Sequence, residues 1–152
     1  MAVSELKPIL LVEDSPKDVE LTLAALERCQ LANAVVVTRD GAEALDYLNA
    51  TGPFEGREGG EPIVVLLDLK LPKVDGLEVL ERIKSDQKLR HTPVVMLTSS
   101  REEQDLVRSY HLGVNAFVVK PVGFEKFFEA IQDLGMFWAV LNEPPPHGRA
   151  GR

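Results

Sequence analysis

Short apolar runs rich in valine, isoleucine and leucine recur five times along the chain, separated by longer stretches with a different spacing. They cover residues 9–12, 35–38, 63–67, 94–98 and 116–119. Runs of four or five such residues without polar alternation are typical of parallel strands that are buried on both faces. We therefore predict five strands, each covered on both sides.

The stretches that follow the strands carry apolar residues every three or four positions, which is the spacing of one helix face. The last stretch begins near Phe124 and runs on toward Leu141. Ser15 and Pro16 suit the start of the first helix, and Gly113 suits the left-handed residue that ends the fourth. The apolar positions that mark the first and fourth stretches are Val19, Leu23, Leu26, Leu106, Val107 and Tyr110.

This regular alternation of strand and helix implies parallel strands that are joined by right-handed crossovers. We predict an α/β fold with one doubly wound, five-stranded parallel sheet and five helices. A chain of 152 residues fits one such domain, which we assign to residues 1–142. The proline-rich segment 143–152 has little to bury and is expected to be a disordered tail. Segment 51–62, with six glycines or prolines, is expected to be an exposed loop.

Charge and hydropathy exclude several classes of partner. A formal net charge of −7 argues against binding a nucleic-acid backbone, because lysine and arginine supply that affinity. No apolar run approaches the ~20 residues that cross a bilayer. Residues 1–8 lack the basic region and the apolar region of a secretory signal. We expect a cytoplasmic protein with no nucleic-acid or membrane partner, whose ligands are proteins or a cation.

Polar side chains end four of the five predicted strands. Glu13 and Asp14 follow the first strand, Asp68 the third, Thr98 ends the fourth and Lys120 follows the fifth. In open α/β sheets, ligands bind beyond the carboxyl ends of the strands. We therefore expect these side chains to share one edge of the sheet, a combination that a random solvated surface would rarely supply.

Three carboxylates at one edge repel one another, at ~4 kcal/mol for a pair 4 Å apart with an effective dielectric constant of about 20. Lys120 offsets one charge, and an oxygen-rich site suits a hard cation such as Mg²⁺. No glycine-rich loop follows the first strand, so phosphate is more plausible as a transferred group than as a resident ligand. Asp68 is the best nucleophile, because a carboxylate can attack phosphorus directly. Lys120 and Thr98 can each hold a phosphoryl oxygen.

Because of these strand-end residues, the chain resembles the receiver domain of two-component response regulators over roughly residues 8–141. The matching stretches are Ile-Leu-Leu-Val-Glu-Asp-Ser-Pro at 9–16, Leu-Leu-Asp-Leu-Lys-Leu-Pro at 66–72 with Asp-Gly at 75–76, Val-Met-Leu-Thr-Ser at 95–99 and Ala-Phe-Val-Val-Lys-Pro at 116–121. The resemblance implies the flavodoxin-like (β/α)5 receiver fold. It also implies a phosphoacceptor regulator rather than an enzyme, with only intrinsic, Mg²⁺-dependent gain and loss of its own phosphoryl group.

The resemblance assigns a role to each matching residue. It makes Asp68 the phosphoacceptor, with Thr98 and Lys120 in contact with the phosphoryl group. Mg²⁺ is expected on Glu13, Asp14, Asp68 and the backbone carbonyl of Lys70. Thr98 and Phe117 are the expected switch pair, although Phe117 could also be a plain core aromatic. The bond before Pro121 is expected to be cis, which aims Lys120 inward.

The implied upstream partner is a sensor histidine kinase. The long loop before the third strand, the Asp-Leu-Lys-Leu-Pro run and Phe137-Trp138 resemble the small regulators paired with bacterial phytochrome kinases, so light is a hypothesis for the input. With no second domain expected after the last helix, output is expected through a downstream protein or a phosphotransfer partner. The fourth helix, fifth strand and fifth helix form the expected readout surface, which is also a candidate homodimer contact that includes Phe137 and Trp138.

Three other functions remain to be weighed. A phosphatase of the haloacid dehalogenase type needs a second aspartate two positions after its nucleophile, where this chain has Lys70. A flavodoxin-like cofactor carrier is disfavoured by the acidic loop where a flavin phosphate would bind. A receiver-like interaction module that works without phosphorylation stays open as the alternative.

Overall fold

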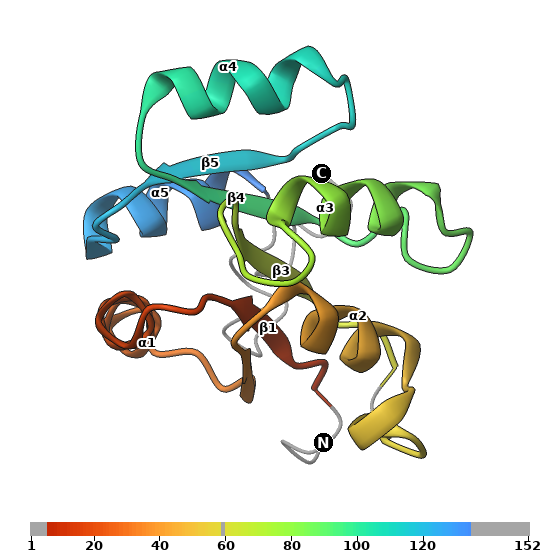
Figure 1. Cartoon of the computed structure of the whole chain (residues 1–152). Coiled ribbons are helices and arrows are strands. Elements are labelled where there is room, and N and C mark those ends of the chain that lie inside the picture. Colours follow the sequence, from red (N-terminus) through yellow and green to blue (C-terminus); the bar gives the residue numbers. More distant parts are fainter. Residues whose placement is uncertain (1–5, 59, 135–152) are drawn as a thin grey trace, which may run out of the picture.

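The computed structural model describes residues 6–58 and 60–134, which form one parallel sheet between two layers of helices (Figure 1). The strands are β1 (Ile9–Val12), β2 (Val35–Thr38), β3 (Val64–Asp68), β4 (Val94–Thr98) and β5 (Ala116–Val119), and their order in the sheet is β2-β1-β3-β4-β5. The helices are α1 (Pro16–Arg28), α2 (Gly41–Asn49), α3 (Gly76–Ser85), α4 (Arg101–Ser109) and α5 (Phe124–Asp133). The predicted doubly wound sheet with five helices is confirmed.

The apolar core is divided into two clusters by the sheet. Alternate residues of a strand point to opposite faces, so Ile9 and Leu11 pack under α1 and α5 whereas Leu10 and Val12 pack under α2 and α3. Every residue of β1, β3 and β4 is buried. The three central strands are therefore packed on both faces, and this packing fixes the positions of the residues at their carboxyl ends.

The prediction that every strand is buried on both faces is wrong for the two edge strands. Three of the four residues of β2 are only partly buried, and Val119 of β5 is 48% exposed. An edge strand has a neighbour on one side only, so its faces are covered less completely. A run of valines does not reveal whether its strand lies at the centre or at the edge of a sheet.

Helix starts follow the local sequence closely, whereas helix ends and exposed faces do not. Ser15 caps α1 as predicted, its hydroxyl accepting a hydrogen bond from the Asp18 N–H. Gly113 has the predicted left-handed backbone (φ 79°), but α4 already ends at Ser109. Three residues expected on buried helix faces are exposed, namely Leu23, Leu106 and Tyr110.

The loop before β3 is more ordered than its composition suggests. It contains a short 3-10 helix, η2 (Gly52–Phe54), where no regular element was predicted. The guanidinium group of Arg57 lies over the Tyr47 ring and donates to the backbone carbonyls of Tyr47 and Leu48. These contacts attach the loop to α2.

Three sequence predictions fall on residues outside the described part of the chain. They are the continuation of the last helix toward Leu141, the contact made by Phe137 and Trp138, and the tail at 143–152. Among residues 6–58 and 60–134, none of the helices has the length and apolar character needed to cross a bilayer.

We predict that Gly76→Ser destabilises the protein by about 1–3 kcal/mol, because α3 begins in direct contact with the end of β3. A Cβ atom at Gly76 would lie 2.1 Å from the backbone oxygen of Asp68 and 2.7 Å from that of Leu69. The matched change Gly123→Ser, at the N-cap of α5 where a Cβ atom would meet no atom within 4 Å, should be neutral or stabilising. Urea unfolding of both variants measures the difference, and equal losses of stability would contradict this packing.

Candidate functional site

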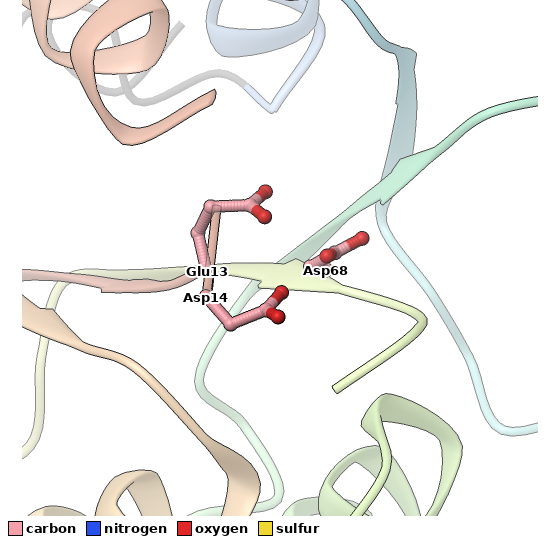
Figure 2. Close-up of side chains that lie close together, drawn as sticks. All are labelled: Glu13, Asp14 and Asp68. Carbon is pink, nitrogen blue, oxygen red and sulfur yellow. The ribbon is translucent and has the colours of Figure 1, made fainter. Parts of the chain in front are cut away.

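The three carboxylates predicted from the strand ends lie together at one edge of the sheet (Figure 2). Glu13 and Asp14 follow β1, and Asp68 is the last residue of the adjacent strand β3. One carboxylate oxygen from each residue lies within 4.8 Å of the others. Glu13 and Asp68 are buried, whereas Asp14 is exposed and opens the cluster to solvent. The predicted convergence is confirmed, and the role of the cluster as a set of metal ligands stays a prediction.

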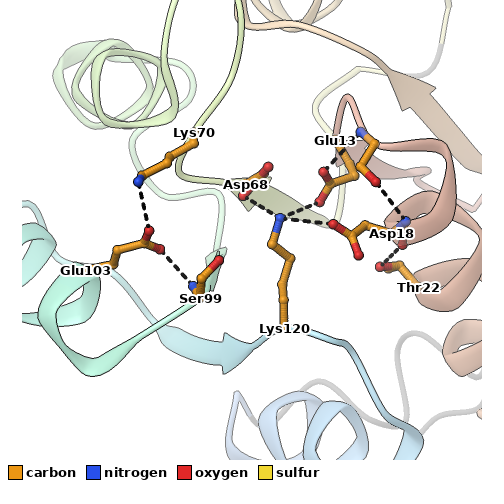
Figure 3. A network of polar contacts seen from close by, with 9 residues as sticks. Glu13, Asp18, Thr22, Asp68, Lys70, Ser99, Glu103 and Lys120 are labelled. Carbon is orange, nitrogen blue, oxygen red and sulfur yellow. Dashed lines mark hydrogen bonds and ion pairs between the residues drawn. The ribbon is translucent and has the colours of Figure 1, made fainter.

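Lys120 places its ammonium group among carboxylates from three different elements (Figure 3). Its Nζ atom lies 3.1 Å from Asp68 Oδ1, 3.4 Å from Glu13 Oε1 and 3.3 Å from Asp18 Oδ2. The side chain is only 14% exposed, so solvent screens these pairs weakly. The peptide bond between Lys120 and Pro121 is cis, as expected. One cation therefore offsets a group of buried negative charges.

The crowding of these groups changes their protonation. Burial raises the pKa of Glu13 to about 7, and the nearby charge of Asp68 adds to the effect. Burial also raises the pKa of Asp68, although Lys120 opposes the shift. Burial lowers the pKa of Lys120, but the carboxylates of Asp68 and Glu13 outweigh it and raise the pKa overall. Lys120 thus stays charged at neutral pH while Glu13 is only partly ionised.

The donor set fits a hard divalent cation. Three carboxylate oxygens converge, and the open side at Asp14 leaves room for the water molecules that such ions keep. A bound cation would favour the ionised forms of Glu13 and Asp68 and so reverse the effect of burial on their pKa values. The Lys70 backbone lowers the pKa of Asp68, so it lies close to the Asp68 carboxyl group and beside the cluster. The Lys70 carbonyl stays a predicted ligand.

Thr98 is also at this edge, at the end of β4. It is fully buried, and it follows Leu97, the residue that pairs with Asp68 across the sheet. Its hydroxyl accepts a hydrogen bond from Gln104 Nε2 at 3.4 Å. The first turn of α4 therefore holds the hydroxyl that was predicted to contact a phosphoryl group.

A second link joins α4 to the site. Glu103 accepts a hydrogen bond from the backbone N–H of Ser99 at 2.7 Å and pairs with Lys70 Nζ at 3.5 Å (Figure 3). Ser100 caps α4, its hydroxyl accepting a hydrogen bond from the Glu103 N–H at 3.2 Å. The loops after β3 and β4 are thus joined through one glutamate.

Phe117, the other predicted switch residue, lies on β5 beside Met96 of β4. It is partly buried and packs against the apolar cluster on the α2–α3 face. The guanidinium group of Arg108 lies 4.5 Å from the centre of its ring. Both predicted switch residues therefore contact α4, Thr98 through Gln104 and Phe117 through Arg108.

Two residues of the site were missed from the sequence, Asp18 and Glu103. Each is an acid in the first turn of a helix, where a carboxylate is common because it stabilises the helix dipole. Asp18 and Lys120 are 102 residues apart, and no local pattern connects them. The sequence signal that could have indicated Asp18 and Glu103 was their place shortly after strands whose last residues belong to the predicted site.

The chain belongs to the response regulator receiver domain family, whose model matches residues 9–132. The probable methanogenesis regulatory protein FilR2 of Methanothrix harundinacea is 42% identical over 137 residues, which cover 90% of this chain and 86% of that protein. The response regulator Rcp1 of Synechocystis sp. is 39% identical over 132 residues, covering 87% and 88%. The predicted resemblance is confirmed, and the chain is a regulator in phosphorylation-based two-component signalling.

Several solved structures that are similar to this chain are response regulators associated with phytochromes. The bacteriophytochrome response regulator AtBRR is 77% identical with a TM-score of 0.85, covering 91% of this chain and 99% of that one. RtBRR, another bacteriophytochrome response regulator, is 69% identical with a TM-score of 0.86, covering 93% and 85%. The Mn²⁺-bound form of Rcp1 and the phosphorylated cyanobacterial phytochrome response regulator RcpA are 39% and 41% identical, each with a TM-score of 0.71 and coverage of 88% and 94%.

We predict that a divalent cation stabilises the protein more at about pH 8 than at about pH 6. The folded-state pKa of Glu13, about 7, lies above its ordinary value of 4.5, so the metal-free folded protein binds an extra proton between these values and loses stability as pH rises through them. A cation needs the ionised carboxylate, so its contribution grows over the same range.

Thermal unfolding with and without Mg²⁺ at the two pH values measures this dependence. Glu13→Gln removes the titrating group and should reduce the difference between the two pH values. Equal stabilisation of the wild-type protein at both pH values would count against the protonation of Glu13.

Proposed function

We propose that the chain accepts a phosphoryl group from a histidine kinase onto Asp68. The observation that supports this most directly is the setting of the Asp68 carboxyl group. The Asp68 side chain is 5% exposed, paired with Lys120 at 3.1 Å and placed beside two further carboxylates at the edge of the sheet. A carboxylate in this setting has a cation in place for the charge of the product, and the exposed Asp14 beside it opens the cluster to solvent.

In the proposed transfer, an Asp68 carboxylate oxygen attacks the phosphorus of a phosphohistidine. The new O–P bond forms as the P–N bond breaks, and the electron pair of that bond stays on the imidazole nitrogen, which takes up a proton. Lys120 balances negative charge on one phosphoryl oxygen, and the Thr98 hydroxyl donates to another. No separate base is needed, because Asp68 reacts in its ionised form.

We propose Mg²⁺ as the physiological cation, held by Glu13, Asp14, Asp68 and the backbone carbonyl of Lys70. The all-oxygen donor set supports this choice, and the Mn²⁺-bound form of Rcp1 supports a divalent ion in the family. When bound, Mg²⁺ supplies positive charge that offsets the charge on the transferring phosphoryl oxygens. Glu13 and Asp68 must then give up part of their contact with Lys120.

The proposed output runs through α4, β5 and α5. A phosphoryl group on Asp68 would compete with Gln104 for the Thr98 hydroxyl, and Phe117 would repack against Arg108. Leu106 of α4, Tyr110 at the carboxyl end of α4 and Val119 of β5 expose apolar surface. A groove of about 670 Å³ lies between α4, β5 and α5. We propose this surface for a downstream or phosphotransfer partner, and for a homodimer.

For the kinase, we propose a bacterial phytochrome, because AtBRR and RtBRR are named as bacteriophytochrome response regulators and share 77% and 69% identity with this chain. Transfer would take place in the cytoplasm, where histidine kinases form phosphohistidine from ATP. The alternative, an interaction module that works without phosphorylation, is disfavoured by the close approach of Lys120 to Asp68.

We predict one phosphate adduct when the protein is incubated with Mg²⁺ and acetyl phosphate, measured by intact mass. The adduct should require the cation and disappear in Asp68→Asn, which keeps the shape of the side chain but removes the attacking carboxylate. Asp46→Asn, a matched change on α2, should leave the adduct unchanged. An adduct that persists in Asp68→Asn would place the acceptor elsewhere, and no adduct on the folded wild-type protein would favour the phosphorylation-independent module.

We predict that Thr98→Val still accepts phosphate but transmits little change to α4 and β5. Valine fills the same buried space without the hydroxyl that links Gln104 to the site. Amide chemical shifts of α4 and β5, recorded before and after phosphorylation, measure the response. Shifts as large as those of the wild-type protein would show that the signal leaves by another route.

A further inference from the structure

The ammonium group of Lys120 has three carboxylate partners, and they do not belong to one cluster. Glu13 and Asp68 are members of the acidic group whose oxygens lie within 4.8 Å of one another. Asp18 is not part of that group, yet its Oδ2 atom lies 3.3 Å from Lys120 Nζ. Figure 3 shows Lys120 between the two sets, with Asp18 approaching from α1.

Lys120 and a cation compete for the same oxygens. An ammonium group has three N–H donors, and here three carboxylates lie within 3.1–3.4 Å of its nitrogen. A divalent ion bound to Glu13 and Asp68 uses oxygen lone pairs that Lys120 now shares. Of the Lys120 partners in the described part of the chain, only Asp18 lies outside the acidic group, so it alone can keep its contact unchanged.

Asp18 is fixed in place by its helix. Its backbone N–H donates to the Ser15 hydroxyl at 3.3 Å, and its carbonyl accepts from Thr22 Oγ1 at 2.8 Å. Its side chain is 25% exposed, compared with 0% for the side chain of Glu13 and 5% for that of Asp68. Asp18 is therefore an anchor on the solvent side of Lys120, whereas the other two partners lie on its buried side.

We propose that Asp18 is a positioning residue that keeps Lys120 in place beside Asp68 when a cation takes up carboxylate oxygens of Glu13 and Asp68, so that the cation and Lys120 can act on Asp68 together. This inference rests on the proposed function, because it assumes a cation at Glu13, Asp14 and Asp68. Asp18 is neither a proposed ligand of the cation nor the proposed phosphoacceptor. Its effect passes through the position of Lys120.

Two simpler roles for Asp18 make different predictions. An acid in the first helical turn stabilises the helix dipole by about 0.3–1 kcal/mol, which changes stability but not cation affinity. A negative charge near the site also attracts any cation, whether or not Lys120 is present. Only the positioning role predicts that the effect of Asp18 on cation affinity depends on the presence of Lys120.

The test measures Mg²⁺ affinity by isothermal titration calorimetry in the full chain and four variants. The variants are Asp18→Asn, Lys120→Met, the double variant and Glu20→Gln, which removes the same charge from an exposed position of α1. We expect Asp18→Asn to weaken Mg²⁺ binding by about threefold to tenfold, as for coupled contacting residues. In the Lys120→Met background the same change should have no more effect than Glu20→Gln, and thermal unfolding in EDTA verifies that each variant is folded.

The outcomes separate this inference from the proposed function. Equal weakening by Asp18→Asn in both backgrounds would overturn the positioning role and leave a simple charge effect. Unchanged or tighter binding in Asp18→Asn would also overturn it, while Mg²⁺ binding and phosphorylation of the wild-type protein would still support the proposed function. A folded wild-type protein that binds no Mg²⁺ would overturn both.

Discussion

The organisation of the site depends on the burial of like charges at the edge of a parallel sheet. β1 and β3 are adjacent, so Glu13, Asp14 and Asp68 are brought together whether or not their charges favour it. The apolar packing of three fully buried central strands offsets this electrostatic cost. Lys120 supplies one positive charge, and the remaining excess of negative charge favours the binding of a cation. Metal affinity is thus a consequence of how the fold places charge.

The proposed readout surface begins at the same edge of the sheet. Gln104 and Glu103, in the first turn of α4, bond to the Thr98 hydroxyl and the Ser99 amide, and Arg108 further along lies on Phe117. α4 buries one residue, Val107, in the core. A helix with so little apolar anchoring depends on these polar contacts, so the proposed phosphoryl group on Asp68 would compete directly with the contacts that position α4.

Prediction from the sequence succeeded where the signal is local. Four of the five predicted strands have the observed bounds, and the third is displaced by one residue, to Val64–Asp68. The predicted start of α1 at Ser15 and Pro16 agrees as well, because a cap depends on neighbouring residues. The exposure of β2 and β5, and of Leu23, Leu106 and Tyr110, was not predictable, because exposure depends on which element covers which.

The sequence by itself determined the fold class, the family and the residues that end the strands, because periodicity and strand-end motifs are written in consecutive positions. Only the tertiary structure decided that Asp18 reaches Lys120 and that Glu103 joins Lys70 to Ser99. These contacts join residues on separate elements, and their distances are set by how the helices pack on the sheet. Side-chain partners across a sheet edge therefore become visible only when the chain is folded.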